Sequence, residues 1–447
     1  MKRTLILLAI ILTPALLKAQ EKEKEPNFGI KFSGFVKSDF FFDTRQTASI
    51  REGHFLLWPK AESLDANGDD LNAVPNFNFL AIQSRITGKI TGPDAFGAKT
   101  SGVIEADFFG NENGAFADVN GFRLRHAFVK LNWTNTELIA GQYWHPMFVT
   151  GCFPGVVSFN TGAPFQPFSR NPQLRLTQSF GNLKLVLAAL SHRDFSTAAG
   201  SAGLRNSAMP DMNLHIQYSS KNESAGTEMF VGAGVEYKTI VPRLSNTVTV
   251  TPAFDSVAYT VNFSDSTVTA QTIHTDAVTA TYKIDEKVSS YAAMAYAMIK
   301  LAPITIKVEG VYGQNLYDVV MLSSYGSTGI DDATTEALSY TPTTCYSFWT
   351  DIQTNGKTIQ GGLFAGYTGN LGGSETATYG FAGTRSSIAN VMRVSPRIIF
   401  NSGKTRFAGE VEYTSAAFGG SYDTKGVPQN TTSVSNLRFL FSAYYFF

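Results

Sequence analysis

The last stretch of the sequence, residues 437–447, alternates strictly between two kinds of position. Apolar side chains take every second place: Leu437, Phe439, Phe441, Ala443, Tyr445 and Phe447. A period of two places these side chains on one face of a β-strand. The other face carries Arg438 and Ser442, so it can face water. We expect lipid to cover the apolar face, because no later segment follows to cover it.

The amino terminus indicates export. Lys2 and Arg3 precede an apolar segment, Leu5–Leu17, and Leu17-Lys18-Ala19 is a suitable cleavage site before Gln20. Residues 1–19 are therefore predicted to be a signal peptide and residues 20–28 a short periplasmic tail. No cysteine follows Ala19, so we do not expect a lipid anchor.

The composition favours a membrane protein built from strands. The chain has 35 Phe and 18 Tyr, yet its most apolar stretch after the signal peptide is only residues 292–299. A transmembrane helix needs about 20 apolar residues. Lipid offers no partner for open backbone groups, so a strand protein must close into a barrel. Without Lys2, Arg3 and Lys18, the 36 basic residues become 33 against 36 acidic ones, which gives no electrostatic case for nucleic acid.

Alternating segments recur from Gly29 onward. Gly29–Phe42 and Phe77–Ile90 are early examples, the second with Leu80, Ile82, Ile86 and Ile90 expected to face outward. Short turns alternate with long loops, which is the pattern of outer-membrane barrels. We predict an all-β, antiparallel transmembrane barrel of about 16 strands over residues 29–447, with long extracellular loops. A strand at Val278–Ile284 could also lie inside the long loop Lys238–Glu286. The alternative is a soluble two-sheet protein with many hairpins.

Several motifs resemble one family of porins. They are Gln83-Ser84-Arg85, Glu105-Ala106-Asp107-Phe108-Phe109-Gly110, Arg123-Leu124-Arg125-His126-Ala127, Gly141-Gln142-Tyr143-Trp144 and Asn171-Pro172-Gln173-Leu174-Arg175. Together they resemble the DcaP-like trimeric porins of Gram-negative outer membranes. Pro210-Asp211 and Val394-Ser395-Pro396-Arg397 match more loosely. The resemblance implies a sixteen-stranded homotrimer that passes small hydrophilic solutes, often carboxylates.

Strand parity predicts the charged side chains that line the pore: Arg85, Glu105, Asp107, Arg123, Arg125, Arg175, Arg393, Arg397 and Arg406. On the lipid face a charge would cost roughly 2–4 kcal/mol at the midplane. These charges could guide ions, or they could form an ion-paired ladder that only joins strands. If Arg123 and Arg125 face inward, then Val129 would too, unless a β-bulge shifts the parity. Otherwise small apolar groups plug the lower wall.

The loop His145–Pro172 is predicted to fold into the barrel as a constriction. It is rich in Phe, Gly and Pro, and we assign its candidate residues as His145, Cys152, Phe153, Phe159, Phe165 and Arg170. An apolar loop is better buried than exposed to water. It contains no Asp or Glu, while arginines remain on the predicted wall. This excess of basic side chains favours selectivity for anions. Five acidic side chains that also face inward by parity oppose it: Glu236, Glu309, Asp351, Glu410 and Glu412.

Other motifs are weaker. Residues 65–70 could be a calcium loop, but the glycine is misplaced and an acidic turn fits better. The six histidines show no ligand spacing, so we expect neither a metal nor another cofactor. Ser191-His192-Arg193-Asp194 is the nearest arrangement to a hydrolase site, and its adjacent residues would point apart. Cys152 and Cys345 could form a disulfide that pins the loop, or could be two buried thiols.

The sequence therefore favours a non-enzymatic porin in the outer membrane of a Gram-negative bacterium. We expect passive diffusion of small hydrophilic solutes, with a preference for anions such as dicarboxylates. A substrate-selective channel, or a surface adhesin or scaffold with a blocked lumen, are the alternatives. The expected partners are outer-membrane lipid, two further copies of the chain, and the barrel-assembly machinery, which would recognise the C-terminal strand.

Overall fold

The computed structural model describes residues 28–110, 121–383 and 385–447. The predicted signal peptide (residues 1–19) and all but the last residue of the predicted tail (20–28) lie outside the described residues. Among the described residues, no helix is long and apolar enough to cross a membrane.

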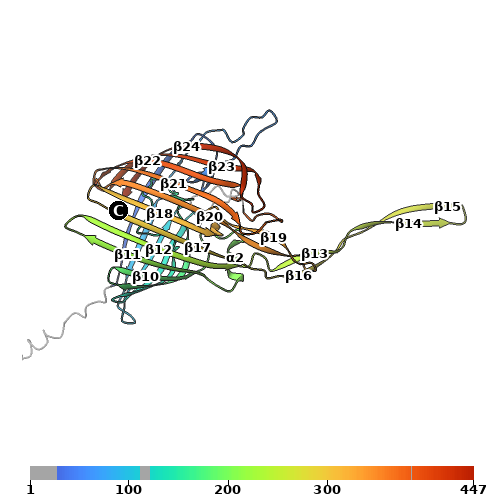
Figure 1. Ribbon diagram of the computed structural model, residues 1–447, viewed down its shortest axis with the longest axis horizontal. Coiled ribbons are helices and arrows are strands. Elements are labelled where there is room, and N and C mark those ends of the chain that lie inside the picture. Colours follow the sequence, from blue (N-terminus) through green and yellow to red (C-terminus); the bar gives the residue numbers. More distant parts are fainter. Residues whose placement is uncertain (1–27, 111–120, 384) are drawn as a thin grey trace, which may run out of the picture.

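The strands form a closed antiparallel barrel (Figure 1). Each wall strand pairs with its neighbours in sequence, and β24 returns to pair with β1 from Phe35↔Phe446 to Asp43↔Arg438. The main sheet contains 18 strands. Two of them, β4 and β5, share one place beside β1, and β19 pairs with an extension of β20 beyond the wall. Sixteen wall positions remain, as predicted.

In order around the ring the wall consists of β1 (Gly29–Asp43), β4 (Asn76–Leu80) with β5 (Arg85–Thr91), β6 (Lys99–Asp107), β7 (Arg123–Asn132), β8 (Thr136–Trp144), β9 (Arg170–Phe180), β10 (Leu183–Leu190), β11 (Asp211–Asn222), β12 (Thr227–Ile240), β17 (Val288–Lys300), β18 (Ile304–Gln314), β20 (Ala337–Thr354), β21 (Ile359–Gly373), β22 (Ile388–Ser402), β23 (Thr405–Tyr422) and β24 (Pro428–Phe446). The elements outside the wall are β2 (Thr47–Ile50), β3 (Phe55–Pro59), β13 (Ser245–Thr251), β14 (Phe254–Asn262), β15 (Thr267–Thr275), β16 (Val278–Lys283), β19 (Tyr325–Asp332), the helix α2 (Gly200–Asn206) and the 3₁₀ helix η1 (Leu316–Val319).

The alternating sequence explains which side chains face the lumen. In β24, Leu437, Phe439 and Phe441 are exposed on the outer surface, whereas Arg438 and Ser442 are buried inside. This confirms the orientation predicted for the last strand. The same two-residue period recurs in β17, where every second side chain from Val288 to Met298 is buried. The outer face of β24 is thus apolar and suited to lipid, with polar side chains pointing inward. In β17 the buried side chains are mostly apolar, and Ala292, Met294, Tyr296 and Met298 join the interior cluster.

The second strand differs from its prediction. Residues 81–84 leave the sheet in a turn closed by Ser84 N–H donating to the carbonyl of Ala81 at 3.1 Å. The wall at this place is therefore two strands, β4 and β5. The side-chain parity differs on the two sides of this turn. Leu80 and Ile82 pack against the interior cluster and not outward as predicted, whereas Ile86 is exposed as predicted.

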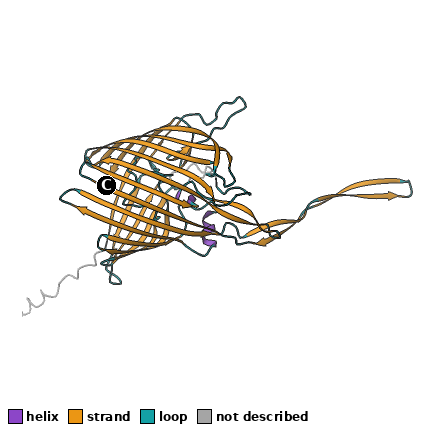
Figure 2. Ribbon diagram, in the orientation of Figure 1, coloured by secondary structure: helices purple, strands orange, loops and turns teal. Residues whose placement is uncertain are grey.

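Connections alternate in length as the sequence indicates. Short turns such as 133–135, 181–182 and 403–404 lie at one end of the barrel, and long loops such as 44–75, 145–169 and 191–210 lie at the other. The long connection after β12 forms an arm of two successive hairpin sections, β13 with β16 and β14 with β15. Val278–Lys283 is thus a strand, but it belongs to this arm. The arm projects from the end opposite the C terminus (Figures 1 and 2).

The strands differ in length around the ring. From β5 to β10 they have 7 to 11 residues, and we call this part the short wall. From β20 to β24 they have 15 to 19 residues, and we call this part the long wall.

Candidate functional site

Three segments fold into the barrel from its loop end. They are the β2–β3 hairpin, the loop 145–169 between β8 and β9, and the segment 315–324 that contains η1. Their apolar side chains form one buried cluster with residues of the wall, among them Phe55, Phe159, Phe168, Leu316 and Trp349. Phe55 and Phe168 have ring centroids 5.1 Å apart, and Phe168 N–H donates to the carbonyl of Val319 at 2.9 Å. The lumen is therefore narrowed by packed protein.

The loop 145–169 is fixed against the long wall by carboxylates. Gly155 N–H donates to Asp351 at 2.9 Å, and Val157 N–H donates to Glu410 at 2.6 Å. Asn160 donates its side-chain amide to Glu412 at 2.7 Å. The sequence showed that the loop lacks carboxylates of its own. The structure adds that the wall supplies them, as acceptors for the loop's N–H groups.

The predicted loop residues divide into buried and half-buried groups. His145, Cys152, Phe159 and Phe165 are fully buried, and Phe153 is half-buried. Phe165 is held by Ser347, whose hydroxyl donates to the Phe165 carbonyl at 2.8 Å. Strand β9 already begins at Arg170, which is buried and donates to Asp194 at 2.6 and 2.9 Å.

The two cysteines are not bridged; both are free and buried. The disulfide alternative is therefore wrong, and the alternative of two buried thiols is right. Cys152 lies beside the carbonyls of Ala297 and Val308, at 3.4 and 3.6 Å. Cys345 instead contacts Ser323 at 3.2 Å. Burial raises the pKa of the Cys152 thiol to about 12, so this thiol is unreactive in the folded protein.

On the long wall, two of the predicted pore arginines, Arg393 and Arg397, are buried and bound to other protein groups. Arg397 forms a two-pronged ion pair with Asp351 at 2.6 and 3.0 Å. Arg393 donates to the carbonyls of Ala163 and Leu57 at 2.8 and 2.7 Å, which ties two inward segments to the wall. Arg406, near the turn end, is half-buried and donates to Asn401 at 2.8 Å.

On the short wall, the predicted residues form an ion-paired ladder. Arg125 bridges Glu105 and Asp107, each at 2.8 Å. Arg123 contacts Asp107 at 2.8 Å, and Arg85 lies 3.7 Å from Glu105. Asp107 and Arg125 are buried, whereas Arg85, Glu105 and Arg123 are partly exposed. The ladder joins β5, β6 and β7, and part of it also faces the lumen.

A β-bulge resolves the parity of β7. The pairing shifts between Glu105↔His126 and Ala106↔Leu124, which leaves Arg125 as the extra residue. Arg123 and Arg125 can therefore both face inward while Val129 faces outward and is exposed. The bulge alternative is confirmed, and the alternative of small apolar groups at this place is wrong.

Two cavities lie along the short wall. One has a volume of about 620 Å³ and is lined at its charged positions by Arg51, Arg123, Arg193 and Asp194. The other has a volume of about 230 Å³ and carries Lys130, Glu137, Arg175 and Lys184. Each cavity thus has three basic side chains and one acidic side chain. Asp107 adds a second carboxylate behind Arg123 in the larger one.

Arg175, unlike Arg85, Arg123, Arg125 and Arg397, makes no ion pair among the described residues, and its hydrogen bonds go to neutral acceptors. It donates to the carbonyl of Trp144 at 2.6 Å and to Gln173 at 2.9 Å. Its charge therefore reaches the smaller cavity without a carboxylate in direct contact. Lys130 and Glu137, in the same cavity, are ion-paired with each other.

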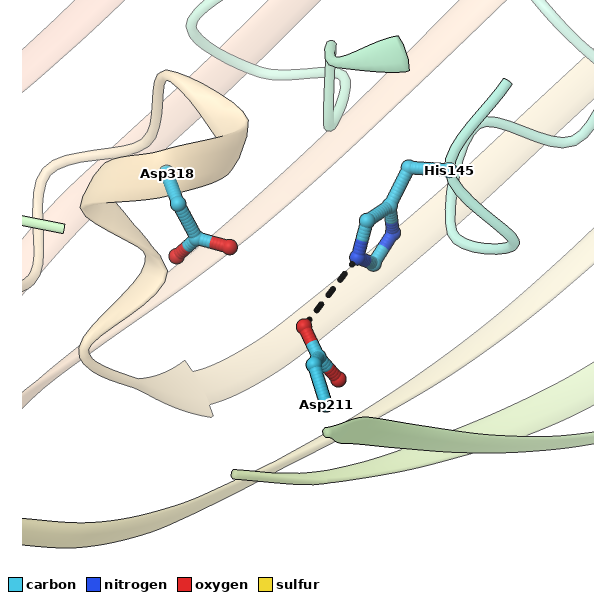
Figure 3. Close-up of side chains that lie close together, drawn as sticks. All are labelled: His145, Asp211 and Asp318. Atoms are coloured by element: carbon cyan, nitrogen blue, oxygen red, sulfur yellow. Dashed lines mark hydrogen bonds and ion pairs between the residues drawn. The ribbon is translucent and has the colours of Figure 1, made fainter. Parts of the chain in front are cut away.

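The sequence missed one cluster of titratable side chains inside the barrel. His145, at the start of the inward loop, lies beside Asp211 of β11 and Asp318 of η1 (Figure 3). Facing ligand atoms of these three buried residues all lie within 4.8 Å of one another. Their sequence positions are too far apart for a spacing rule to find. Only Pro210-Asp211, which is one of the looser family motifs, drew attention to this place.

Two smaller predictions are also decided by geometry. Asp65 accepts the backbone N–H groups of Asn67 and Asp69 at 2.8 and 2.9 Å, as an acidic turn does. These hydrogen bonds, from Asp69 first, lower the pKa of Asp65. In the hydrolase-like motif, His192 contacts Asp211 and Asp318, while Asp194 pairs with Arg170. No catalytic contact joins His192 to Asp194 within the described residues.

The fold is that of known porins. The barrel is similar to the outer-membrane-expressed OmpT of Vibrio cholerae, with a TM-score of 0.51 and 11% identity over 95% of this chain and 99% of that one. It is also similar to the anion-selective porin from Comamonas acidovorans, with a TM-score of 0.51 and 9% identity over 94% of this chain and 100% of that one. The chain has the porin fold. No protein-family profile matches the sequence, and no curated protein matches it.

Proposed function

We propose that this chain is an outer-membrane porin of a Gram-negative bacterium that passes small hydrophilic solutes by passive diffusion. Its fold, its apolar outer face and its polar interior support this function. The predicted signal peptide, residues 1–19, would direct export, and the short tail, residues 20–28, would remain in the periplasm. The barrel-assembly machinery would recognise the C-terminal strand, whose apolar face then meets lipid.

The proposed selectivity is for small anions such as dicarboxylates. The observation that carries it is the excess of basic over acidic side chains in both short-wall cavities. Three arginines of the long wall, Arg397, Arg438 and Arg393, contribute little, because the carboxylates of Asp351, Asp43 and Glu412 lie beside them. In a narrow lumen with low-dielectric walls, charged side chains act at short range and are only partly screened.

Planar-bilayer recording tests both parts of the proposal. Purified barrel should produce discrete open steps, and the reversal potential under a KCl gradient should have the sign of chloride preference. Potassium preference in the unmodified channel would contradict the anion proposal while leaving the channel proposal intact. The absence of open steps from protein shown to be folded would contradict the channel itself.

We also propose that the barrel is a homotrimer of the DcaP-like kind. The short wall supports this assembly. A lipid-exposed strand needs about 9–11 residues to span the bilayer, whereas β10 has 8. Contact with another subunit would remove this mismatch. One of the similar structures is a trimer form of Vibrio cholerae OmpT. Sedimentation in detergent should give three chains per particle, and a monomer would contradict the proposal.

A second candidate is a surface scaffold with a blocked lumen. The observation that favours it is the apolar cluster formed by the three inward segments, together with the arm β13–β16, whose residues are largely exposed. The same bilayer recording separates the two functions, since a scaffold would produce no open steps.

A further inference from the structure

We propose that the cluster around His145, Asp211 and Asp318 is a binding site for one Zn²⁺ ion inside the barrel. The three ligands come from segments that are distant in sequence: the inward loop through His145, the wall strand β11 through Asp211, and η1 through Asp318. His192, in the connection after β10, contacts both carboxylates. A metal here would hold the inward segments to the wall. This inference is independent of the transport function proposed above.

The ligand types suit zinc. Imidazole nitrogen and carboxylate oxygen are common zinc ligands, at 2.0–2.2 Å, in sites that are almost always tetrahedral when structural. All of the ligand-bearing side chains are buried, with His145, Asp211 and Asp318 at 0% exposure and His192 at 3%. The mixture of imidazole and carboxylate favours zinc and similar transition ions over calcium or magnesium, which take oxygen ligands.

The contacts between imidazoles and carboxylates fit a shared metal better than they fit strong hydrogen bonds, and the ligand atoms of His145, Asp211 and Asp318 all lie within 4.8 Å of one another. Asp211 Oδ2 lies 3.4 Å from His145 Nε2 and 3.3 Å from His192 Nε2, and Asp318 Oδ2 lies 3.1 Å from His192 Nε2. A tetrahedron with bonds of about 2.0–2.1 Å has edges of about 3.3–3.4 Å. Charge-assisted hydrogen bonds are about 2.7–2.9 Å long.

Lys238 provides an internal comparison for these distances. It contacts Asp318 Oδ1 at 2.6 Å and Glu236 Oε1 at 2.8 Å, which are lengths of charge-assisted hydrogen bonds. Each of these carboxylates therefore has one oxygen occupied by Lys238. The second oxygens, Asp318 Oδ2 and Glu236 Oε2, make no hydrogen bond.

Glu236 is the independent sign that a cation is needed. Its side chain is 1% exposed, and its unpartnered Oε2 lies 4.0 Å from His145 Nε2. Three carboxylates, those of Asp211, Glu236 and Asp318, meet here in contact with the two imidazoles, and they outnumber the two neighbouring cations, Lys238 and Arg385. Buried carboxylates are costly unless they are paired, and a divalent cation would pair them.

Coordination through Nε2 places the remaining proton of His145 on Nδ1. The contact from Met147 N–H to that Nδ1, at 3.3 Å, would then be lost. This contact is longer than the usual range for N–H hydrogen bonds, so the loss is small beside the gain from metal binding.

The first experiment measures zinc bound to the purified full-length barrel in detergent. After equilibration with Zn²⁺ and removal of the excess, elemental analysis should find about one zinc per chain. Asp211→Asn, Asp318→Asn and His145→Gln should each weaken binding by at least about tenfold. The matched control is His274→Gln, which removes an exposed histidine 2.6 Å from Asp255 in the arm. It should leave the zinc content unchanged.

A second measurement keeps the proposal testable if the variants fail to form heat-modifiable barrels. Cobalt bound to the unmodified protein should give the visible absorption of a tetrahedral ion, and X-ray absorption of the zinc form should show imidazole ligands at about 2.0 Å. Zinc that is absent from the wild type, retained by folded Asp318→Asn, lost in His274→Gln, or bound without imidazole would overturn the assignment.

Discussion

The short and long walls of the barrel use the same residue types in different ways. On the long wall, the buried carboxylates of Asp351, Glu410 and Glu412 accept hydrogen bonds from the inward loop. The Arg397 guanidinium is also buried there, in an ion pair with Asp351. On the short wall, Arg85, Arg123 and Arg175 remain partly exposed, and both cavities lie beside them.

This difference shows that facing the lumen is not the same as lining a water-filled path. Parity places a charged side chain inside the barrel on either wall. Whether it then meets solute or protein depends on where the loop 145–169 comes to rest. In this barrel the loop is hydrogen-bonded to the long wall, and the two charged cavities lie beside the short wall.

The largest expected effect comes from removing a buried anchor of the long wall. Asp351→Ala leaves Arg397 buried without its partner and removes the acceptor of Gly155 N–H. We expect a loss of about 3–5 kcal/mol in the free energy of unfolding. The measurement is denaturant unfolding in lipid vesicles, followed by tryptophan fluorescence.

The matched variant on the short wall is Glu137→Ala. Glu137 pairs with Lys130, and both side chains are about one-third exposed, at 31% and 30%. The loss should be only about 0–1 kcal/mol. Equal losses for the two variants would remove the distinction between anchoring and solvent-facing charges.

The next prediction concerns the seam where the long wall meets β1. Phe447 exchanges two backbone hydrogen bonds with Gly34, at 3.1 and 3.2 Å. Two backbone bonds are worth about 1–3 kcal/mol, so deletion of Phe447 should lower the yield of heat-modifiable barrel in outer membranes several-fold. Quantitative gel analysis of membrane fractions measures this yield. Normal assembly without Phe447 would show that the seam and the assembly signal do not depend on it.

Selectivity should depend on the short wall alone. A unit charge about 8 Å from an ion in water contributes about 0.5 kcal/mol, so Arg175→Ala should reduce the chloride-to-potassium permeability ratio by roughly two- to sixfold. Reversal potentials under a KCl gradient give this ratio. As the control, the double variant Arg397→Gln with Asp351→Asn removes a neutral pair and should leave the ratio unchanged in protein that folds. A larger shift in the control would place the solute path at the long wall.

The smallest change is expected from the cysteines. Because Cys152 and Cys345 are free and buried, the loop is held by packing and hydrogen bonds and not by a covalent bridge. Thiol labelling of unfolded, unreduced protein should find two reactive groups per chain, and folded protein should label slowly. Fewer than two thiols in the unfolded sample would restore the disulfide hypothesis.

The sequence alone determined the architecture of this protein. A two-residue period fixes which face of each strand is apolar, and the alternation of short and long connections fixes a meander that can close on itself. Both signals are local, so they could be read from residues such as those of β24 without knowledge of any distant contact. They sufficed for the sixteen positions and for the inward direction of Arg85 and Arg175.

Only the tertiary structure decided what the inward side chains do. The turn at 81–84 and the bulge at Arg125 each change which face of the strand the following side chains occupy. The two-residue alternation of apolar side chains does not reveal where such a change occurs. The contacts of Asp351 with the loop, and of His145 with Asp211 and Asp318, join residues that are 66 to 196 positions apart. No sequence period connects such residues, because their proximity arises from the closing of the ring and the inward folding of the loops.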